Sequence, residues 1–357
     1  MKKVLVGICD IGNGHINRQK SVISYLRSQG ICVAVVTPQR SADYLQRLFP
    51  DIKIIQSAIP WITCDKEGID FIDTLERHVK NKLDYYEIFL RAAIQIEEYF
   101  RVKPDLVISD YEPLTARYAY ARSIPVICME QQAKYIYLKN ILLADHSNQE
   151  EKSRLNLFFP HTDLRIISSF FPVDNLPKDV ICIPPIIDVL PSTHTTSRMG
   201  VVYFSPYYDD SEEQRKILLL IQALSDYRFI LYTNQDKWRS FGCTNIIVKR
   251  FSEEFKFDLA RSEFVISSSG HQLISESIQL EKPLLLFPLD TYEQNYNCRM
   301  VEKYKLGKRL ELFTKNEFNE FYYSIPEYRR SVCDFKKQFW VKNWEQALTD
   351  ALQTVLN

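Results

Sequence analysis

The sequence predicts an α/β protein built from two parallel-sheet domains joined by a short linker. Short apolar runs alternate with helical patterns in each half of the chain, and a polar stretch without apolar periodicity separates the halves. With 357 residues, 46% of them apolar, the chain exceeds the size that one hydrophobic core usually serves. These three observations favour two Rossmann-like domains with a cleft between them.

The N-terminal half begins with an apolar run, Val4 to Ile8, that we interpret as a buried strand. A glycine-rich loop follows, and the next helical pattern ends at Gly30, in the position of a C-terminal cap. Further apolar runs separated by helical stretches are typical of parallel α/β order. We therefore place an N-terminal domain at residues 1–190. The further strands are predicted at 32–37, 52–55, 106–109 and 126–129.

Residues 190–198, LPSTHTTSR, are polar, β-branched and proline-bearing, so we predict the interdomain linker there. A second alternation of strands and helices predicts a C-terminal domain at 198–339, in which Gly307 follows a helical pattern as a cap. Residues 340–357 have helical spacing, and we expect this helix to cross back and pack on the N-terminal domain. Strands are predicted at 201–204, 229–232, 246–248, 264–266 and 284–287, and helices at 212–224 and 272–280.

Composition excludes several classes of protein. The 45 basic residues balance 45 acidic residues, so the chain lacks the basic excess of a protein that binds nucleic acid through its field. The eight cysteines include no C-x-x-C pair, which predicts reduced thiols and no zinc site. No run approaches the ~18 apolar residues that span a bilayer. We expect a cytoplasmic protein, with at most peripheral contact at the inner face of a membrane.

The strongest functional signal lies in residues 264–307. A strand delivers the loop Ser268-Ser269-Gly270, whose small residues let backbone N–H groups approach an anion at the start of the next helix. Glu276, one to two turns into that helix, can accept hydrogen bonds from ribose hydroxyls. Glu293 and Gln294 open a later helix, where they can contact sugar hydroxyls. Together these parts suit a nucleotide-diphospho-sugar.

The order of these residues, SSGHQ-x-x-SE, then K-P, then EQ-x-x-N, resembles the donor signature of GT-B glycosyltransferases. That group includes UDP-glycosyltransferases and the peptidoglycan N-acetylglucosaminyltransferase that acts on a lipid-linked acceptor. The resemblance implies a GT-B fold with the donor in the C-terminal half and the acceptor in the N-terminal half. It also places Phe251 near the nucleotide base. The remaining expected donor residues are Ser205, His271 and Gln272.

Two departures from this signature leave the sugar open. Plant-type members carry His-Cys-Gly where this chain has Ser268-Ser269-Gly270, which weakens a side-chain contact to phosphate. Glu293 stands where aspartate is usual, which keeps the hydrogen-bonding type and changes its reach. We expect a UDP-linked donor, with dTDP and GDP as alternatives.

The loop after the first strand, Gly12-Asn13-Gly14-His15, supplies a candidate base. It lacks the third glycine of a dinucleotide fingerprint, so an NAD-dependent oxidoreductase is disfavoured. We predict that His15 takes the acceptor's proton and that Asp110, at the end of another strand, orients its ring. This pairing resembles that of plant-type UDP-glycosyltransferases. Glu112 is the alternative orienter, and Asp110 could instead be only a helix N-cap. Gly12, Asn13, Gly14 and Glu112 are assigned to an acceptor-side loop.

The sequence therefore predicts a glycosyltransferase that moves a sugar from a nucleoside diphosphate to an acceptor hydroxyl with inversion. No Asp-x-Asp occurs, so we expect neither a metal nor a cofactor. The acceptor stays open among small molecules, glycans and lipid-linked compounds. Aromatic residues in 59–100 could shape its pocket, although such spacing is also typical of core. Two rival functions remain: a nucleotide-sugar 2-epimerase of the same fold, and a non-catalytic nucleotide-sugar-binding subunit.

Overall fold

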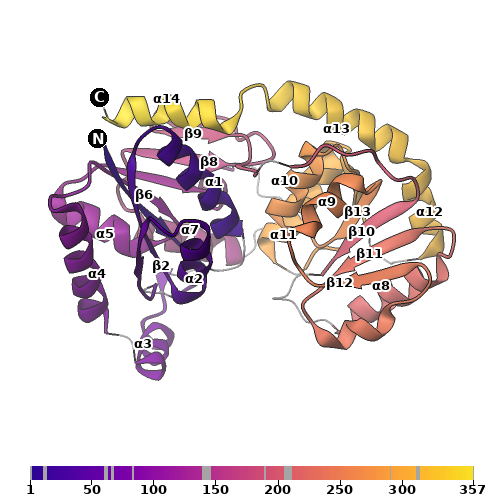
Figure 1. Cartoon of the computed structure of the whole chain (residues 1–357), viewed down its shortest axis with the longest axis horizontal. Coiled ribbons are helices and arrows are strands. Elements are labelled where there is room, and N and C mark those ends of the chain that lie inside the picture. Colours follow the sequence, from indigo (N-terminus) through magenta and orange to yellow (C-terminus); the bar gives the residue numbers. More distant parts are fainter. Residues whose placement is uncertain are drawn as a thin grey trace. The chain divides into compact units, whose positions relative to one another are not determined.

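The chain folds into two compact units in the computed structural model (Figure 1). Unit 1 comprises Met1–Asp188 and Lys342–Asn357, and unit 2 comprises Val189–Val341. Of the residues singled out from the sequence, Gly12, Asn13 and Ser205 lie outside the described ranges. The structure describes residues 2–10, 14–59, 63–65, 68–82, 84–138, 146–188, 190–204, 211–289, 291–310 and 314–356.

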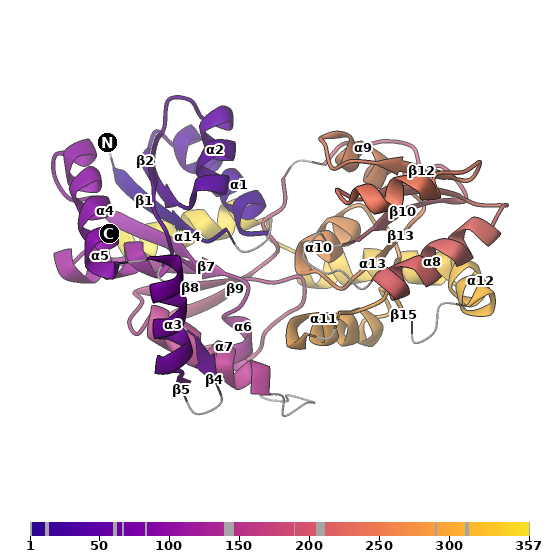
Figure 2. The same cartoon turned by 90° about the horizontal axis from the view of Figure 1, so that it is seen from below.

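Unit 1 is built on a seven-stranded parallel sheet in the order β3-β2-β1-β6-β7-β8-β9. Figure 2 labels β1, β2, β7, β8 and β9 of this sheet. A separate antiparallel pair joins β4 to β5. The central strands are buried along almost their whole length because helices cover both faces of the sheet. The strands are β1 (Lys3–Ile8), β2 (Cys32–Thr37), β3 (Lys53–Gln56), β4 (Cys64–Asp65), β5 (Gly68–Ile69), β6 (Leu106–Asp110), β7 (Val126–Glu130), β8 (Leu164–Ser168) and β9 (Val180–Ile183).

The helices of unit 1 form two cores with this sheet. One face packs against α1, α2 and α14, and the other against α4, α5 and α7. The C-terminal helix α14 thus belongs to the first core, where the Trp344 and Tyr25 ring centroids lie 5.8 Å apart. The helices are α1 (Gly14–Ser28), α2 (Gln39–Leu48), α3 (Phe71–Asn81), α4 (Tyr85–Phe100), α5 (Pro113–Arg122), α6 (Lys134–Tyr137), α7 (His146–Phe158) and α14 (Trp344–Leu356).

Gly7 in β1 lets the start of α5 approach the sheet. A Cβ atom on Gly7 would lie 2.1 Å from Thr115 Oγ1 and 2.6 Å from Glu112 Oε2. Glu112 is the N-cap of α5, and its carboxylate accepts the N–H groups of Leu114 and Thr115 at 2.9 and 2.8 Å. The capped end of α5 therefore rests directly on β1, two residues after the end of β6.

Unit 2 is built on a six-stranded parallel sheet in the order β12-β11-β10-β13-β14-β15. Its strands are β10 (Met199–Tyr203), β11 (Arg228–Tyr232), β12 (Ile246–Lys249), β13 (Phe264–Ser267), β14 (Leu284–Leu286) and β15 (Gly307–Arg309). Its helices are α8 (Ser211–Ala223), the 3₁₀ helix η1 (Asp236–Phe241), α9 (Glu254–Arg261), α10 (His271–Gln279), α11 (Tyr292–Lys303), α12 (Lys315–Tyr323) and α13 (Ile325–Phe339). The predicted fold class, two parallel α/β halves, is confirmed.

The predicted helix cap at Gly307 is wrong. α11 ends at Lys303, and the residue with left-handed backbone that follows is Lys305, with a φ of 53°. Gly307 instead begins β15, where a Cβ atom would lie 2.0 Å from the carbonyl oxygen of Leu284. Close contact between neighbouring strands, rather than a helix end, is what requires glycine at this position.

No helix in the described part of the chain combines the length and the apolar content needed to cross a bilayer.

Candidate functional site

Each sheet contains one point where the strand order reverses. In unit 1, β1 lies between β2 and β6; in unit 2, β10 lies between β11 and β13. Ligands of open parallel sheets bind outside the carboxyl ends of the strands at such switch points. The predicted proton-transfer residues follow β1 and end β6, and the predicted diphosphate loop follows β13. The predicted proton-transfer residues and the predicted diphosphate loop therefore both lie at the switch points of their sheets.

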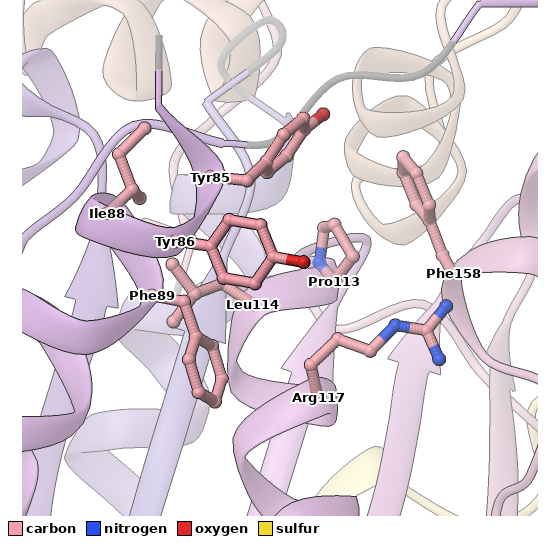
Figure 3. A pocket seen from close by; sticks show the side chains of 8 residues that line it. All are labelled: Tyr85, Tyr86, Ile88, Phe89, Pro113, Leu114, Arg117 and Phe158. Atoms are coloured by element: carbon pink, nitrogen blue, oxygen red, sulfur yellow. The ribbon is translucent and has the colours of Figure 1, made fainter.

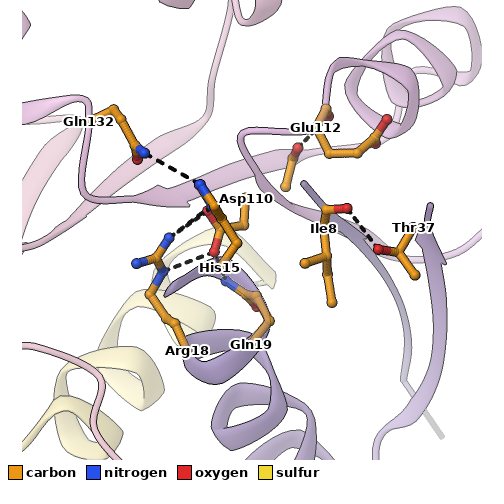
Figure 4. A network of polar contacts seen from close by, with 9 residues as sticks. Ile8, His15, Arg18, Gln19, Thr37, Asp110, Glu112 and Gln132 are labelled. Carbon is orange, nitrogen blue, oxygen red and sulfur yellow. Dashed lines mark hydrogen bonds and ion pairs between the residues drawn. The ribbon is translucent and has the colours of Figure 1, made fainter. Parts of the chain in front are cut away.

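His15 and Asp110 meet at the switch point of unit 1 (Figure 4). His15 lies in the first turn of α1, Asp110 ends β6, and His15 Nδ1 is 2.8 Å from Asp110 Oδ1, with both side chains buried. Because an ionised carboxylate only accepts, Nδ1 must donate, which leaves Nε2 as the proton acceptor of the ring. Gln132 Nε2 lies 3.4 Å from this atom, and the Tyr111 ring centroid lies 5.9 Å from that of His15.

Two residues not predicted from the sequence complete the surroundings of Asp110. Arg18 donates from Nε to Oδ2 at 2.9 Å and from Nη2 to Oδ1 at 2.8 Å. Gln19 donates from Nε2 to Oδ2 at 2.9 Å. His15, Arg18 and Gln19 share one face of α1 because they are spaced i, i+3 and i+4, a signal that was present in the sequence. Burial raises the pKa of Asp110, but the charges of Arg18 and His15 outweigh burial and lower it to about 2.

Glu112 has a different environment from Asp110. Both of its carboxylate oxygens accept N–H groups of α5, and burial raises the pKa of this side chain despite these bonds. Of these two carboxylates, Asp110 contacts His15 and Glu112 caps α5. Gly14 begins α1, where an added Cβ would meet nothing within 4 Å.

The neighbouring strand β7 ends in a second buried acid, Glu130, which the sequence reasoning also missed. Its carboxylate lies 3.5 Å from Nη1 of Arg165 on β8, and both side chains are buried. Glu130 has the same strand parity as Cys128 and so faces the core of α4, α5 and α7, opposite to Asp110. Burial raises the pKa of Glu130 to about 8, against the opposing effect of Arg165.

The predicted diphosphate loop of unit 2 leads from β13 into α10. Ser268, Ser269 and His271 are buried, and Gly270 is the N-cap of α10. Gly270 has no side chain that could cap the helix start, and a helix N-terminus of this kind suits an anion.

Gln294, near the start of α11, joins this loop to the loop after β14. Its Oε1 accepts the N–H groups of Ser269 at 3.1 Å and Leu289 at 3.0 Å. Asn297, one turn later, donates from Nδ2 to the Ser269 carbonyl at 2.9 Å. These bonds occupy the carbonyl oxygen of Gln294 and leave its amide N–H groups to meet a ligand. Glu293 precedes it and is half-buried.

Gln272 and Glu276 lie together on α10. Gln272 Nε2 donates to Glu276 Oε1 at 2.9 Å, and both side chains are half-buried. Phe251 lies after β12, where its ring is 38% exposed and packs 5.1 Å from the ring of Tyr203. Tyr203 pairs in register with Ser267, directly before the diphosphate loop. Because β10 and β13 are neighbouring strands, the Tyr203 and Phe251 rings lie near the start of the diphosphate loop.

A cavity of about 340 Å³ lies between α4 and α5 of unit 1 (Figure 3). Phe158 forms part of its wall, and its ring centroid lies 5.6 Å from that of Tyr111, which packs against His15. The cavity is therefore linked to His15 by two aromatic rings. Its wall is Tyr85, Tyr86, Ile88, Phe89, Pro113, Leu114, Arg117 and Phe158. In the described ranges, no three His, Cys, Asp or Glu side chains gather as a metal site.

Two parallel α/β units with residues of this kind at their switch points define the GT-B class of glycosyltransferases. The chain belongs to glycosyl transferase family 1, whose family model matches residues 2–326. It is therefore a glycosyltransferase. Comparison with curated protein sequences gives no match.

Solved structures share the fold at low sequence identity. A UDP-glucose:anthocyanidin 3-O-glucosyltransferase in complex with UDP matches with a TM-score of 0.75 and 13% identity, covering 99% of this chain and 98% of the other. The glycosyltransferase of kitacinnamycin gives 0.71 and 13%, covering 99% of both chains. UGT2 of Phytolacca americana, complexed with UDP-2-fluoro-glucose and pterostilbene, gives 0.69 and 11%, covering 100% of both.

We predict that Glu130→Gln stabilises the protein in a pH-dependent way. Between pH 4.5 and about 8 the unfolded chain releases the Glu130 proton while the folded chain retains it, so folding weakens as pH rises through this window. The variant removes that penalty, and its free energy of unfolding should exceed that of the parent by about 1–3 kcal/mol at pH 8. The advantage should be near zero at pH 4.5. Urea unfolding measures both values.

The control for this measurement is Glu98→Gln, which changes an exposed glutamate on α4 and should shift stability little at either pH. An equal effect of Glu130→Gln at pH 4.5 and pH 8 would show that Glu130 does not titrate in this window.

Proposed function

We propose that the protein transfers a sugar from a UDP-sugar to an acceptor hydroxyl, with inversion and without a divalent metal. The observation that carries this proposal is the buried contact between His15 Nδ1 and Asp110 Oδ1 at a switch point of a family 1 glycosyltransferase. This contact orients the imidazole and leaves one ring nitrogen basic, which is what proton removal from an alcohol requires.

In the proposed reaction, His15 Nε2 takes the proton of the acceptor hydroxyl as the oxygen attacks the anomeric carbon. The bond from that carbon to the diphosphate oxygen breaks, and UDP leaves with the bonding electron pair. A single displacement of this kind inverts the anomeric configuration. Asp110 stabilises the imidazolium as it forms, because its pKa of about 2 keeps the carboxylate ionised.

Unit 2 is proposed to bind the donor. The start of α10 and the backbone N–H groups of Ser268 and Gly270 would meet the diphosphate, and Glu276 would accept from the ribose hydroxyls. The Phe251 and Tyr203 rings offer an apolar surface for the base. Helix N–H groups would then supply the neutralising role that a metal has in other transferases, in keeping with the absence of Asp-x-Asp. UDP in the similar anthocyanidin glucosyltransferase supports this donor.

A transfer assay tests the proposed function. The protein is incubated with UDP-, dTDP- and GDP-sugars and a panel of alcohol acceptors. EDTA is present in large excess over trace metal. We predict acceptor-dependent release of UDP and an inverted glycoside. Conversion of UDP-N-acetylglucosamine to a 2-epimer without acceptor would replace the proposal by an epimerase. Donor binding without any turnover would indicate a binding subunit, and activity lost in EDTA and restored by Mn²⁺ would refute metal independence.

We predict that Glu276→Ala weakens UDP binding by about 1–3 kcal/mol, because charge-assisted hydrogen bonds to the ribose are lost. Calorimetric titration with UDP measures the affinity. Gln279→Ala, at an exposed position of the same helix, is the matched control and should bind UDP like the parent. Unchanged affinity in a folded Glu276→Ala variant would remove this residue from the donor site.

We predict that His15→Ala lowers kcat by about 10²–10⁴-fold, the usual contribution of a general base, while UDP affinity stays nearly constant. His194→Ala, which changes an exposed histidine outside both candidate sites, serves as the control. Full turnover of His15→Ala with a saturating acceptor would place the base elsewhere.

A further inference from the structure

The guanidinium of Arg18 touches both members of the proposed proton-transfer pair. It forms two hydrogen bonds with Asp110, and its Nη2 also lies 3.2 Å from His15 Nδ1. All three side chains are buried, with exposed fractions of 3% for Arg18, 0% for Asp110 and 5% for His15. A permanent positive charge is therefore held within contact distance of the imidazole, in surroundings that screen charges weakly.

We propose that Arg18 is a positioning residue that acts through Asp110: it fixes the carboxylate on His15 Nδ1 and, by its charge, limits how readily Nε2 holds a proton in the resting enzyme. This inference rests on the proposed function only in taking His15 as the base. It extends that function by naming the residue that sets the basicity of the base.

The charge balance explains the effect. An aspartate alone beside a buried histidine favours the imidazolium, because the two charges attract. With Arg18 in place, the resting site of neutral His15, Asp110 and Arg18 carries no net charge. Proton uptake then creates a net positive charge next to the guanidinium, so the imidazolium is less favoured than in a simple pair.

Among the described residues, Arg18 is the cation recorded within hydrogen-bond distance of His15. On α7, Glu151 and Arg154 form an ion pair of opposite charges that contacts the Tyr111 side chain. α1 contributes Arg18 and the neutral Gln19, β6 contributes Asp110, and the following Tyr111 packs its ring on His15. Gln132 approaches Nε2 and is neutral. On β7, burial raises the pKa of Glu130 to about 8 and the pKa of the Cys128 thiol well above its usual value, so both are largely uncharged at neutral pH.

Gln19 provides an internal comparison. It donates to Oδ2 of Asp110 at 2.9 Å, the same oxygen and the same distance as Nε of Arg18, but it carries no charge. Loss of Gln19 therefore removes a hydrogen bond alone, whereas loss of Arg18 removes hydrogen bonds and a charge. The two substitutions separate the geometric part of the role from the electrostatic part.

The test is a titration of His15 by NMR in protein labelled with ¹⁵N-histidine and free of substrates, with the His15 signals assigned by their loss in His15→Gln. We expect Arg18→Gln, which keeps an amide donor but removes the charge, to raise the midpoint by about 1–2 pH units. Arg18→Lys, which keeps the charge, should stay within about half a unit of the parent, and Gln19→Met should shift far less than Arg18→Gln. In every folded variant the neutral ring should carry its proton on Nδ1.

An unchanged midpoint in Arg18→Gln, or equal shifts in Arg18→Gln and Gln19→Met, would overturn the proposal. If Arg18→Gln does not fold, Arg18→Met combined with Asp110→Asn removes both charges together. A midpoint in that double variant matching that of Asp110→Asn alone would equally contradict a role for the guanidinium charge.

Kinetics separate this inference from the proposed function. The acid limb of kcat/KM should move to higher pH in Arg18→Gln by the same amount as the NMR midpoint, whereas Arg18→Lys should mainly lower kcat. A third outcome is a shifted NMR midpoint of His15 with an unshifted acid limb of kcat/KM. It would support the control of His15 by Arg18 and show that His15 is not the base.

Discussion

The buried carboxylate of Asp110 is the interaction on which the candidate site of unit 1 depends. Three side chains of α1 donate four hydrogen bonds to its two oxygens, so the carboxylate fixes the rotation of the first turns of α1 relative to β6. Because this charge is fully buried, it is tolerated only while its donors remain. The same bonds hold the histidine ring in one orientation, which means that the fold and the chemistry of this edge share one constraint.

Among the acids near the carboxyl edge of this sheet, Asp110, Glu112 and Glu130 differ in their properties because they have different partners. Asp110 stays ionised because a guanidinium and an imidazole meet it. Glu112 accepts two helix N–H groups and anchors α5 on β1, at a contact that Gly7 permits. Glu130 has Arg165 at 3.5 Å, which is too distant to offset burial. Position on the sheet alone therefore does not decide which acid contacts His15.

The sequence predicted most of the apolar strands, but it missed the apolar strand β9 and the strands β8 and β15, which carry charged residues. β1, β6 and β7 were found because they are continuous apolar runs, whereas β8 was missed because Arg165 interrupts it, and its partner Glu130 is distant in sequence. β15 was missed because two of its three residues are basic. The close contact at Gly307 was mistaken for a helix cap because both situations require glycine, and only the neighbouring strand distinguishes them.

At the candidate sites, pattern and resemblance pointed to His15 and Asp110, which the structure places 2.8 Å apart. Arg18 and Gln19 were not predicted, although their spacing from His15 puts all three residues on one helix face. Arginine and glutamine side chains on a helix are more often solvated than buried. Gln294 was expected to contact sugar, and its role in joining two loops through Oε1 depends on backbone atoms that carry no sequence signal.

In the proposed mechanism, unit 2 binds the nucleotide and unit 1 supplies the base. Hydrogen–deuterium exchange with and without saturating UDP tests it most directly, because a bound ligand protects the amides that it contacts. The account predicts slower exchange at the starts of α10 and α11, with little change in α1 and β6. Protection by UDP confined to α1 and the end of β6, with none at α10, would contradict it.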